Sequence, residues 1–122
     1  MANVTASLKL AAAILIVAIA VPATAQINPF GRYQRLTEED MRLIESASAK
    51  LYTSDSPKVG SAERWSNPSS GNAGTVTLSQ IFEKDGMPCR KLRHSIMVSG
   101  EKEPAIFIFD RCRVASGEWK LL

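Results

Sequence analysis

The residues of this chain best suited to chemistry are its single histidine, His94, and its two cysteines, Cys89 and Cys112. A lone histidine without a second imidazole or a free thiol has too few partners for a zinc site, which takes about four such ligands. A general-base role for His94 would need a nucleophile that no motif nominates, and no phosphate-binding loop or H-E-x-x-H pattern occurs. We therefore expect His94 to be structural, with no catalytic residues, no metal site and no cofactor.

The N-terminal segment has the features of a secretory signal. An apolar run, Leu10–Val21, follows Lys9, and the small residues Ala23-Thr24-Ala25 suit a signal peptidase, so we expect residues 1–25 to be cleaved off before Gln26. The run has 12 residues, fewer than the roughly 20 of a membrane-spanning helix, and its retention as an anchor is the alternative. No cysteine follows the run to accept a lipid. The sequence predicts an exported, non-lipidated protein of the periplasm or cell surface.

Export also bears on the cysteines. Two cysteines in an oxidising compartment most often form one disulfide, so Cys89 and Cys112 are expected to be joined. Residues 26–122 suit one small domain, whose modest core such a cross-link would supplement. The net charge of +3 is small, and basic residues are not interleaved with aromatic ones in the manner of a nucleic-acid-binding protein. We therefore expect no nucleic-acid partner.

One amphipathic helix is predicted over 38–52. The preceding residues 26–36 show no periodicity and are interpreted as a flexible leader. Thr37 can cap the first helical turn, and Asp40, three residues later, can complete a capping box. Ser54-Asp55-Ser56-Pro57 ends the helix. The apolar stripe of the helix consists of Met41, Ile44, Ala47 and Leu51.

The remainder of the chain predicts a small β-sheet. Alternating apolar and polar residues separated by turn residues indicate strands at 62–66, 75–83, 89–98, 104–114 and 118–122. The fold class is therefore α+β, in which the helix packs on one face of a four- to five-stranded, mainly antiparallel sheet within a domain at 37–122.

Turn geometry sets the expected strand registers. If Gly100 and Glu101 form a two-residue hairpin tip, Cys89 lies directly opposite Cys112, close enough for a disulfide. The same register places Lys91 opposite Asp110, Leu92 opposite Phe109, and Arg90 unfavourably opposite Arg111.

At Asp85-Gly86 we expect a three-residue tip with a bulge. A two-residue tip would place Ser79 opposite Leu92, so the apolar residues of the two strands would point to opposite faces of the sheet. The bulged tip would place Val76 opposite Ile96 and Leu78 opposite His94.

Several motifs occur in a fixed order in the second half of the chain. The stretch 65–76 has the pattern W-x-N-P-x-S-G-x-x-G-x-V, followed by Cys89-Arg90, then Cys112-Arg113 and Gly117-Glu118-Trp119. Over residues 63–122 this order resembles the C-terminal domain of the bacterial 17 kDa outer-membrane surface antigen family, known from rickettsiae. The resemblance implies a cell-envelope protein without enzymatic activity. The lipid-bearing cysteine and glycine-rich stretch of the founding antigens are absent, which favours a soluble periplasmic or secreted form over outer-membrane attachment.

A candidate binding surface combines aromatic and basic residues. Tryptophans at two ends of a small core could stack on a ligand, although ordinary packing is the simpler interpretation. The basic residues around the disulfide could bind lipopolysaccharide phosphates or an acidic protein patch, although a solvated rim is the simpler interpretation. The residues concerned are Trp65, Asn67, Arg90, Lys91, Arg93, Arg111, Arg113 and Trp119.

The sequence thus supports a non-enzymatic surface-antigen-like envelope protein that acts through its surface. The alternative is a small exported ligand-binding or inhibitor protein, and a hydrolase that uses His94 in a cleft ranks third. The partner is an unidentified envelope component or protein. Peripheral association with the outer membrane is compatible with this interpretation, and we expect no transmembrane segment after signal cleavage.

Overall fold

The computed structural model describes residues 12–18, Phe30 and residues 35–122. The expected cleavage site and most of the expected leader lie outside these residues. Residues 12–18 form no helix or strand, and they are exposed. Phe30, within the expected leader, is buried in the core. No helix in the described part of the chain is both long and apolar enough to cross a membrane.

Helix α1 extends over Glu38–Tyr52, as the sequence predicts, and it begins with the expected capping box. The Asp40 amide donates to the Thr37 hydroxyl at 3.1 Å, and the Thr37 amide donates to the Asp40 carboxylate at 2.9 Å. Two amides that would otherwise lack a partner are thereby satisfied. The apolar residues of α1 recur at helical spacing, so one face of the helix is buried against the sheet. Its buried apolar residues are Ile44, Ala47, Leu51 and Tyr52.

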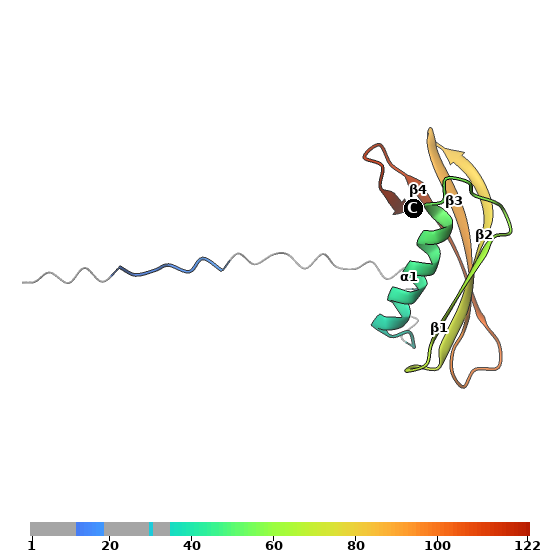
Figure 1. The fold of residues 1–122 in the computed structure, drawn as a ribbon, viewed down its shortest axis with the longest axis horizontal. Helices are drawn as coiled ribbons and strands as arrows, with labels where there is room; N and C mark the ends of the chain where they lie inside the picture. Colours follow the sequence, from blue (N-terminus) through green and yellow to red (C-terminus); the bar gives the residue numbers. More distant parts are fainter. Residues whose placement is uncertain (1–11, 19–29, 31–34) are drawn as a thin grey trace, which may run out of the picture.

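Five antiparallel strands follow α1 and pair in chain order, so that each strand lies beside its neighbours in the sequence (Figure 1). This arrangement confirms the predicted α+β class and sheet. The strands are β1 (Ala62–Asn67), β2 (Asn72–Lys84), β3 (Met87–Met97), β4 (Ala105–Arg113) and β5 (Trp119–Leu121).

The two faces of the sheet differ because successive side chains of a strand point in opposite directions. Helix α1 lies along one face of the sheet (Figure 1). That face carries the core residues Val76, Leu78, Leu92 and Ile96, which are at most 1% exposed. We call the opposite face the open face. Following the strand registers, its residues include Arg64 and Ser66 of β1, Ala73, Thr75, Thr77 and Lys84 of β2, Lys91, Arg93, Ser95 and Met97 of β3, Ile106, Ile108 and Asp110 of β4, and Lys120 of β5.

The register between β3 and β4 is the one that the turn at Gly100 predicts. Cys89 faces Cys112, and a disulfide joins the two residues across the adjacent strands. The predicted pairs of Lys91 with Asp110, Leu92 with Phe109, and Arg90 with Arg111 are present as well.

The predicted register between β2 and β3 is wrong. Asp85 and Gly86 form a two-residue tip with positive φ values of 51° and 76°, a geometry that matches the twist of a hairpin. The extra residue that keeps the apolar face aligned is Ser79, in a bulge within β2, and not a residue of the turn. Val76 consequently faces His94, and Leu78 faces Leu92.

Candidate functional site

Asp40 is the centre of a buried polar network between α1 and the β1–β2 turn. Its carboxylate is fully buried and accepts hydrogen bonds from Asn67 Nδ2 and Asn72 Nδ2, each at 2.8 Å. The Ser70 hydroxyl donates at 2.7 Å and the Thr37 amide at 2.9 Å. Each carboxylate oxygen therefore has two donors, which compensates the cost of burying the charge.

This network determines the ionisation of Asp40. Burial opposes the charged form, but hydrogen bonds from Thr37, Ser70, Asn72 and Asn67 outweigh it and lower the pKa of Asp40 from 3.8 to about 2. Asp40 is a carboxylate at neutral pH, and the protein itself occupies both of its oxygens. The arrangement is suited to holding the turn against the helix and not to transferring a proton.

Asn67, a predicted binding residue, therefore has a structural position. It is 5% exposed, and its side-chain oxygen accepts a hydrogen bond from the Ser69 amide at 3.1 Å. Gly71 completes the turn with a φ of 77°, which glycine adopts without strain. The sequence assigned Asp40 only to the helix cap. The signal for its second role is the pair of asparagines that flanks this turn, since both can donate side-chain hydrogen bonds.

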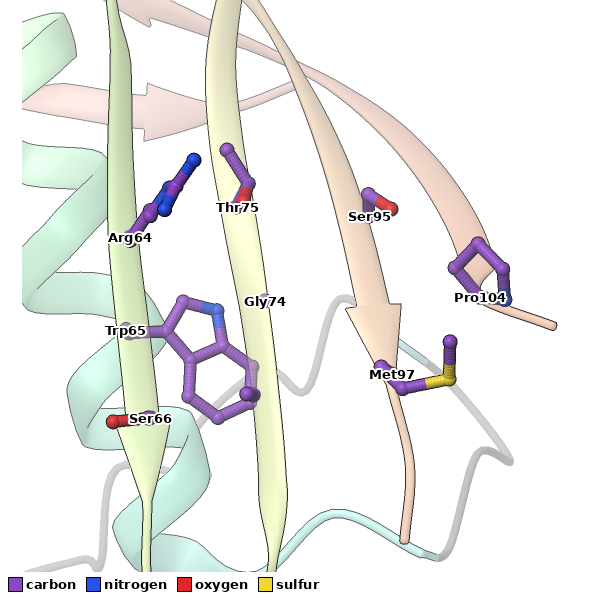
Figure 2. A pocket seen from close by; sticks show the side chains of 9 residues that line it. Arg64, Trp65, Ser66, Gly74, Thr75, Ser95, Met97 and Pro104 are labelled. Carbon is purple, nitrogen blue, oxygen red and sulfur yellow. The ribbon is translucent and has the colours of Figure 1, made fainter. Parts of the chain in front are cut away.

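The two tryptophans also lie in packed surroundings. Trp65 is 6% exposed and extends from β1 toward Gly74, which faces it on β2 (Figure 2). A Cβ atom on Gly74 would lie 2.7 Å from Trp65 Nε1, so the indole ring can lie this close only to a glycine. Trp119 is half-buried, with its ring 5.1 Å from the guanidinium carbon of Arg90 and beside Tyr52. These surroundings favour ordinary packing over ligand stacking.

The sheet divides the predicted basic cluster between its two faces. Arg90, Arg111 and Arg113 point toward the face that α1 covers, whereas Lys91 and Arg93 point toward the open face. The strand register thus keeps neighbouring basic residues apart, because residues adjacent in sequence cannot share a face.

Two of these arginines are engaged inside the domain. The Arg111 guanidinium binds the Glu45 carboxylate at 2.5 Å, and it lies 4.6 Å from the centre of the Tyr52 ring. Arg90 donates to the Cys89 carbonyl at 3.0 Å. The contacts of Arg111 link β4 to α1, whereas the hydrogen bond of Arg90 lies within β3 and its contact with Trp119 links β3 to β5.

On the open face, Lys91 and Arg93 differ. The Lys91 ammonium binds the Asp110 carboxylate at 2.7 Å and lies 5.6 Å from the Phe82 ring. Arg93 is exposed and has no carboxylate within salt-bridge distance among the described residues. Of the two, Arg93 has its charge available for a partner.

His94 lies in an aromatic enclosure beneath the sheet. It is 4% exposed, and its ring centroid is 5.4 Å from that of Phe30 and 5.5 Å from that of Phe109. Burial, with a smaller contribution from the Arg111 charge, lowers the pKa of His94 from 6.5 to about 4, so the ring is neutral at pH 7. Within the described part of the chain, no three His, Cys, Asp or Glu side chains are grouped to hold a metal.

A hollow of about 560 Å³ is present on the open face (Figure 2). Its middle is lined by small residues on neighbouring strands, Thr75 and Ser95, which face each other. Arg64 of β1 borders one side, and Met97 of β3 borders the other. The sequence analysis did not select these four residues. The available signal was the run of small polar residues on alternate positions of β2.

The comparison with known families agrees with these features. The sequence profile of the 17 kDa outer membrane surface antigen family matches residues 53–120. The chain belongs to this family. The part of the chain that matches this family includes strands β1 to β4, most of β5, the disulfide and the turn that binds Asp40. The family resemblance seen in the sequence is thereby confirmed.

Curated relatives in the genus Rickettsia bear the name 17 kDa surface antigen. The chain is 31% identical over 88 residues to the protein of Rickettsia bellii (strain RML369-C) and 32% identical over 88 residues to that of Rickettsia conorii, covering 71% of this chain and 53% of each relative. The protein of Rickettsia prowazekii is 29% identical over 86 residues, 70% of this chain and 52% of the relative. The chain thus spans about half the length of these relatives. No solved structure matches it.

Proposed function

We propose that this protein is an exported, non-enzymatic component of the cell envelope that acts through interactions of its surface. The observation that carries the proposal is membership of a family whose relatives are named surface antigens. The disulfide between Cys89 and Cys112 supports export, because such bonds persist in oxidising compartments. The apolar run before Ala23-Thr24-Ala25 supports it independently.

The test is fractionation of the native cell, with the chain followed by mass spectrometry under non-reducing conditions. The expected result is recovery in the periplasmic or envelope fraction, with an N-terminus at Gln26 and the two cysteines oxidised. Recovery in the cytoplasmic fraction with both thiols free would contradict the proposal. Crosslinking before fractionation would identify the partner.

A second candidate function is a small exported ligand-binding protein. The hollow beside Thr75 and Ser95 favours it, because a concave site with a cation at its border can orient a small polar ligand. Thr75→Trp would fill the hollow from the open face. If ligand binding is the function, a small compound is expected to copurify with the wild-type protein, and the variant is expected to lose it while remaining in the same cell fraction.

A further inference from the structure

The charges of the domain are divided between its two sides. Among the described strands, the open face carries the cations Arg64, Lys84, Lys91, Arg93 and Lys120 and one acid, Asp110. Lys91 neutralises Asp110. Helix α1, on the other side of the sheet, has acidic residues in excess of basic ones. The α1 side also carries Arg90, Arg111 and Arg113, but the acids of α1 offset them, so the larger excess of positive charge lies on the open face.

Apolar side chains lie among these cations. Ile106 and Ile108 of β4 are 44% and 56% exposed, and Met97 of β3 is 41% exposed. The register places Ile108 directly opposite Arg93, so an exposed apolar group and an available cation are neighbours. Burial of exposed apolar area by a partner would be favourable.

The hollow provides a polar binding site on the same face. Arg64 borders it, and the hydroxyl-bearing residues Thr75 and Ser95 line it (Figure 2). A guanidinium beside hydroxyl groups suits a phosphate oxygen, since arginine binds phosphate with two parallel hydrogen bonds. Arg64, like Arg93, has no carboxylate within salt-bridge distance among the described residues.

We infer that the open face docks on the surface of an anionic phospholipid bilayer, with Arg64 and Arg93 binding lipid phosphates and Ile106 and Ile108 entering the acyl boundary. This inference deepens the proposed function, on which it rests, by assigning the partner of the surface. Side chains of this mixture match the headgroup region, where phosphates adjoin hydrocarbon. Attraction between basic residues and anionic lipids orients the acidic helix away from the membrane.

An acidic protein is the competing occupant, and the arrangement of the face favours the bilayer. A protein interface usually has an apolar centre from which charged residues are depleted, with a polar rim. On the open face Arg93 is flanked by the exposed Ile108, so apolar and charged groups are interleaved. The surface of a bilayer can match such an arrangement, because its polar headgroups and apolar chains are mobile and can adjust to neighbouring charged and apolar side chains.

The test is cosedimentation of the full chain with vesicles of phosphatidylcholine that contain phosphatidylglycerol. The double variant Arg64→Gln/Arg93→Gln is expected to bind about 30-fold more weakly, because each cation near an anionic surface contributes about a factor of five. The matched control, Arg42→Gln/Lys50→Gln, removes the same charge from the exposed side of α1 and is expected to bind like the wild type. Ile108→Ser is expected to weaken binding without a change in charge.

Four outcomes would overturn the inference, and the last of them is crosslinking to a protein. The first is equal binding by the wild type and the open-face variant, and the second is an equal loss in the helix variant, which would show dependence on net charge alone. The third is displacement by inorganic phosphate beyond that caused by chloride at matched ionic strength, which would identify a free anion as the ligand. Crosslinking of Arg64 and Arg93 to an acidic protein without vesicle binding would assign the face to that protein.

The vesicle assay is independent of cell fractionation. Envelope location without vesicle binding would refute only the bilayer as partner. Vesicle binding by a chain that stays in the cytoplasm would refute the proposed function.

Discussion

Asn67 donates its side-chain amide to Asp40 over 2.8 Å, which joins the turn after β1 to the first turn of α1. The two residues are 27 positions apart in the chain, and both are buried. The helix therefore attaches to the sheet by a charge-assisted hydrogen bond as well as by apolar packing. This bond fixes where α1 begins relative to the strands.

Asp40→Asn is expected to lower the free energy of unfolding by about 3 kcal/mol. The substitution removes the negative charge and leaves the donors of Asn67, Asn72 and Ser70 buried without a full set of acceptors. Urea denaturation followed by circular dichroism measures the loss. Glu39→Gln, in the same helical turn but exposed, serves as the control and is expected to have little effect. Equal losses in the two variants would contradict the network.

Stability is expected to fall as the pH is lowered from 6.5 to 4 because of His94. Its pKa of about 4 in the folded protein is below the ordinary 6.5, so the unfolded chain binds the proton more readily across this window. The contribution of His94 to the free energy of unfolding is fully present above pH 6.5, and about 3 kcal/mol of it is lost by pH 4. Unfolding midpoints measured at several pH values test this dependence.

His94→Phe keeps an aromatic ring among Phe30 and Phe109 and removes the titrating group. The variant is expected to show a nearly flat profile between pH 6.5 and 4. The pKa of Asp40 is lowered from 3.8 to about 2, so protonation of Asp40 reduces stability mainly below pH 3.8. It therefore contributes little to the slope between pH 6.5 and 4. The same slope in the variant and the wild type would assign the effect to another group.

The elements that follow local rules were predictable from the sequence. The capping residues and apolar spacing defined α1, and the turn at Gly100 placed Cys89 opposite Cys112. The bulge at Ser79 was missed because the extra residue was expected in the turn, although Asp85-Gly86 is a dipeptide typical of two-residue tips. The position of the bulge within β2 depends on packing between distant elements.

The candidate site was less predictable for the same physical reason. Alternation along a strand separates Arg90 from Lys91, but the sequence alone does not state which face the helix covers. The role of Trp65 depends on its cross-strand neighbour Gly74, and the role of Asn67 depends on Asp40. Each is a contact between elements that only the folded chain brings together.

Replacement of both cysteines, Cys89→Ser with Cys112→Ser, is expected to reduce the free energy of unfolding by about 3 kcal/mol. The bond closes a loop with a sequence separation of 23, and its removal enlarges the unfolded ensemble. Denaturation with and without a reducing agent measures the effect. The wild type should lose stability on reduction, whereas the double variant should not respond. A wild type that is indifferent to reduction would show that the bond does not form in the purified protein.

Gly74→Ala is expected to destabilise the protein by roughly 2 kcal/mol, because the added methyl group overpacks a filled space. A Cβ atom at this position would lie 2.7 Å from both the Ser95 carbonyl oxygen and Trp65 Nε1. The backbone oxygen cannot move without disturbing the pairing of β2 with β3, so the indole ring must shift. Urea denaturation gives the loss, and tryptophan fluorescence reports the shift of the ring. Thr75→Ser, the adjacent substitution, removes one methyl group at a partly exposed position and should change neither signal appreciably. An unchanged midpoint and emission spectrum in Gly74→Ala would show that the strand tolerates a side chain beneath the hollow.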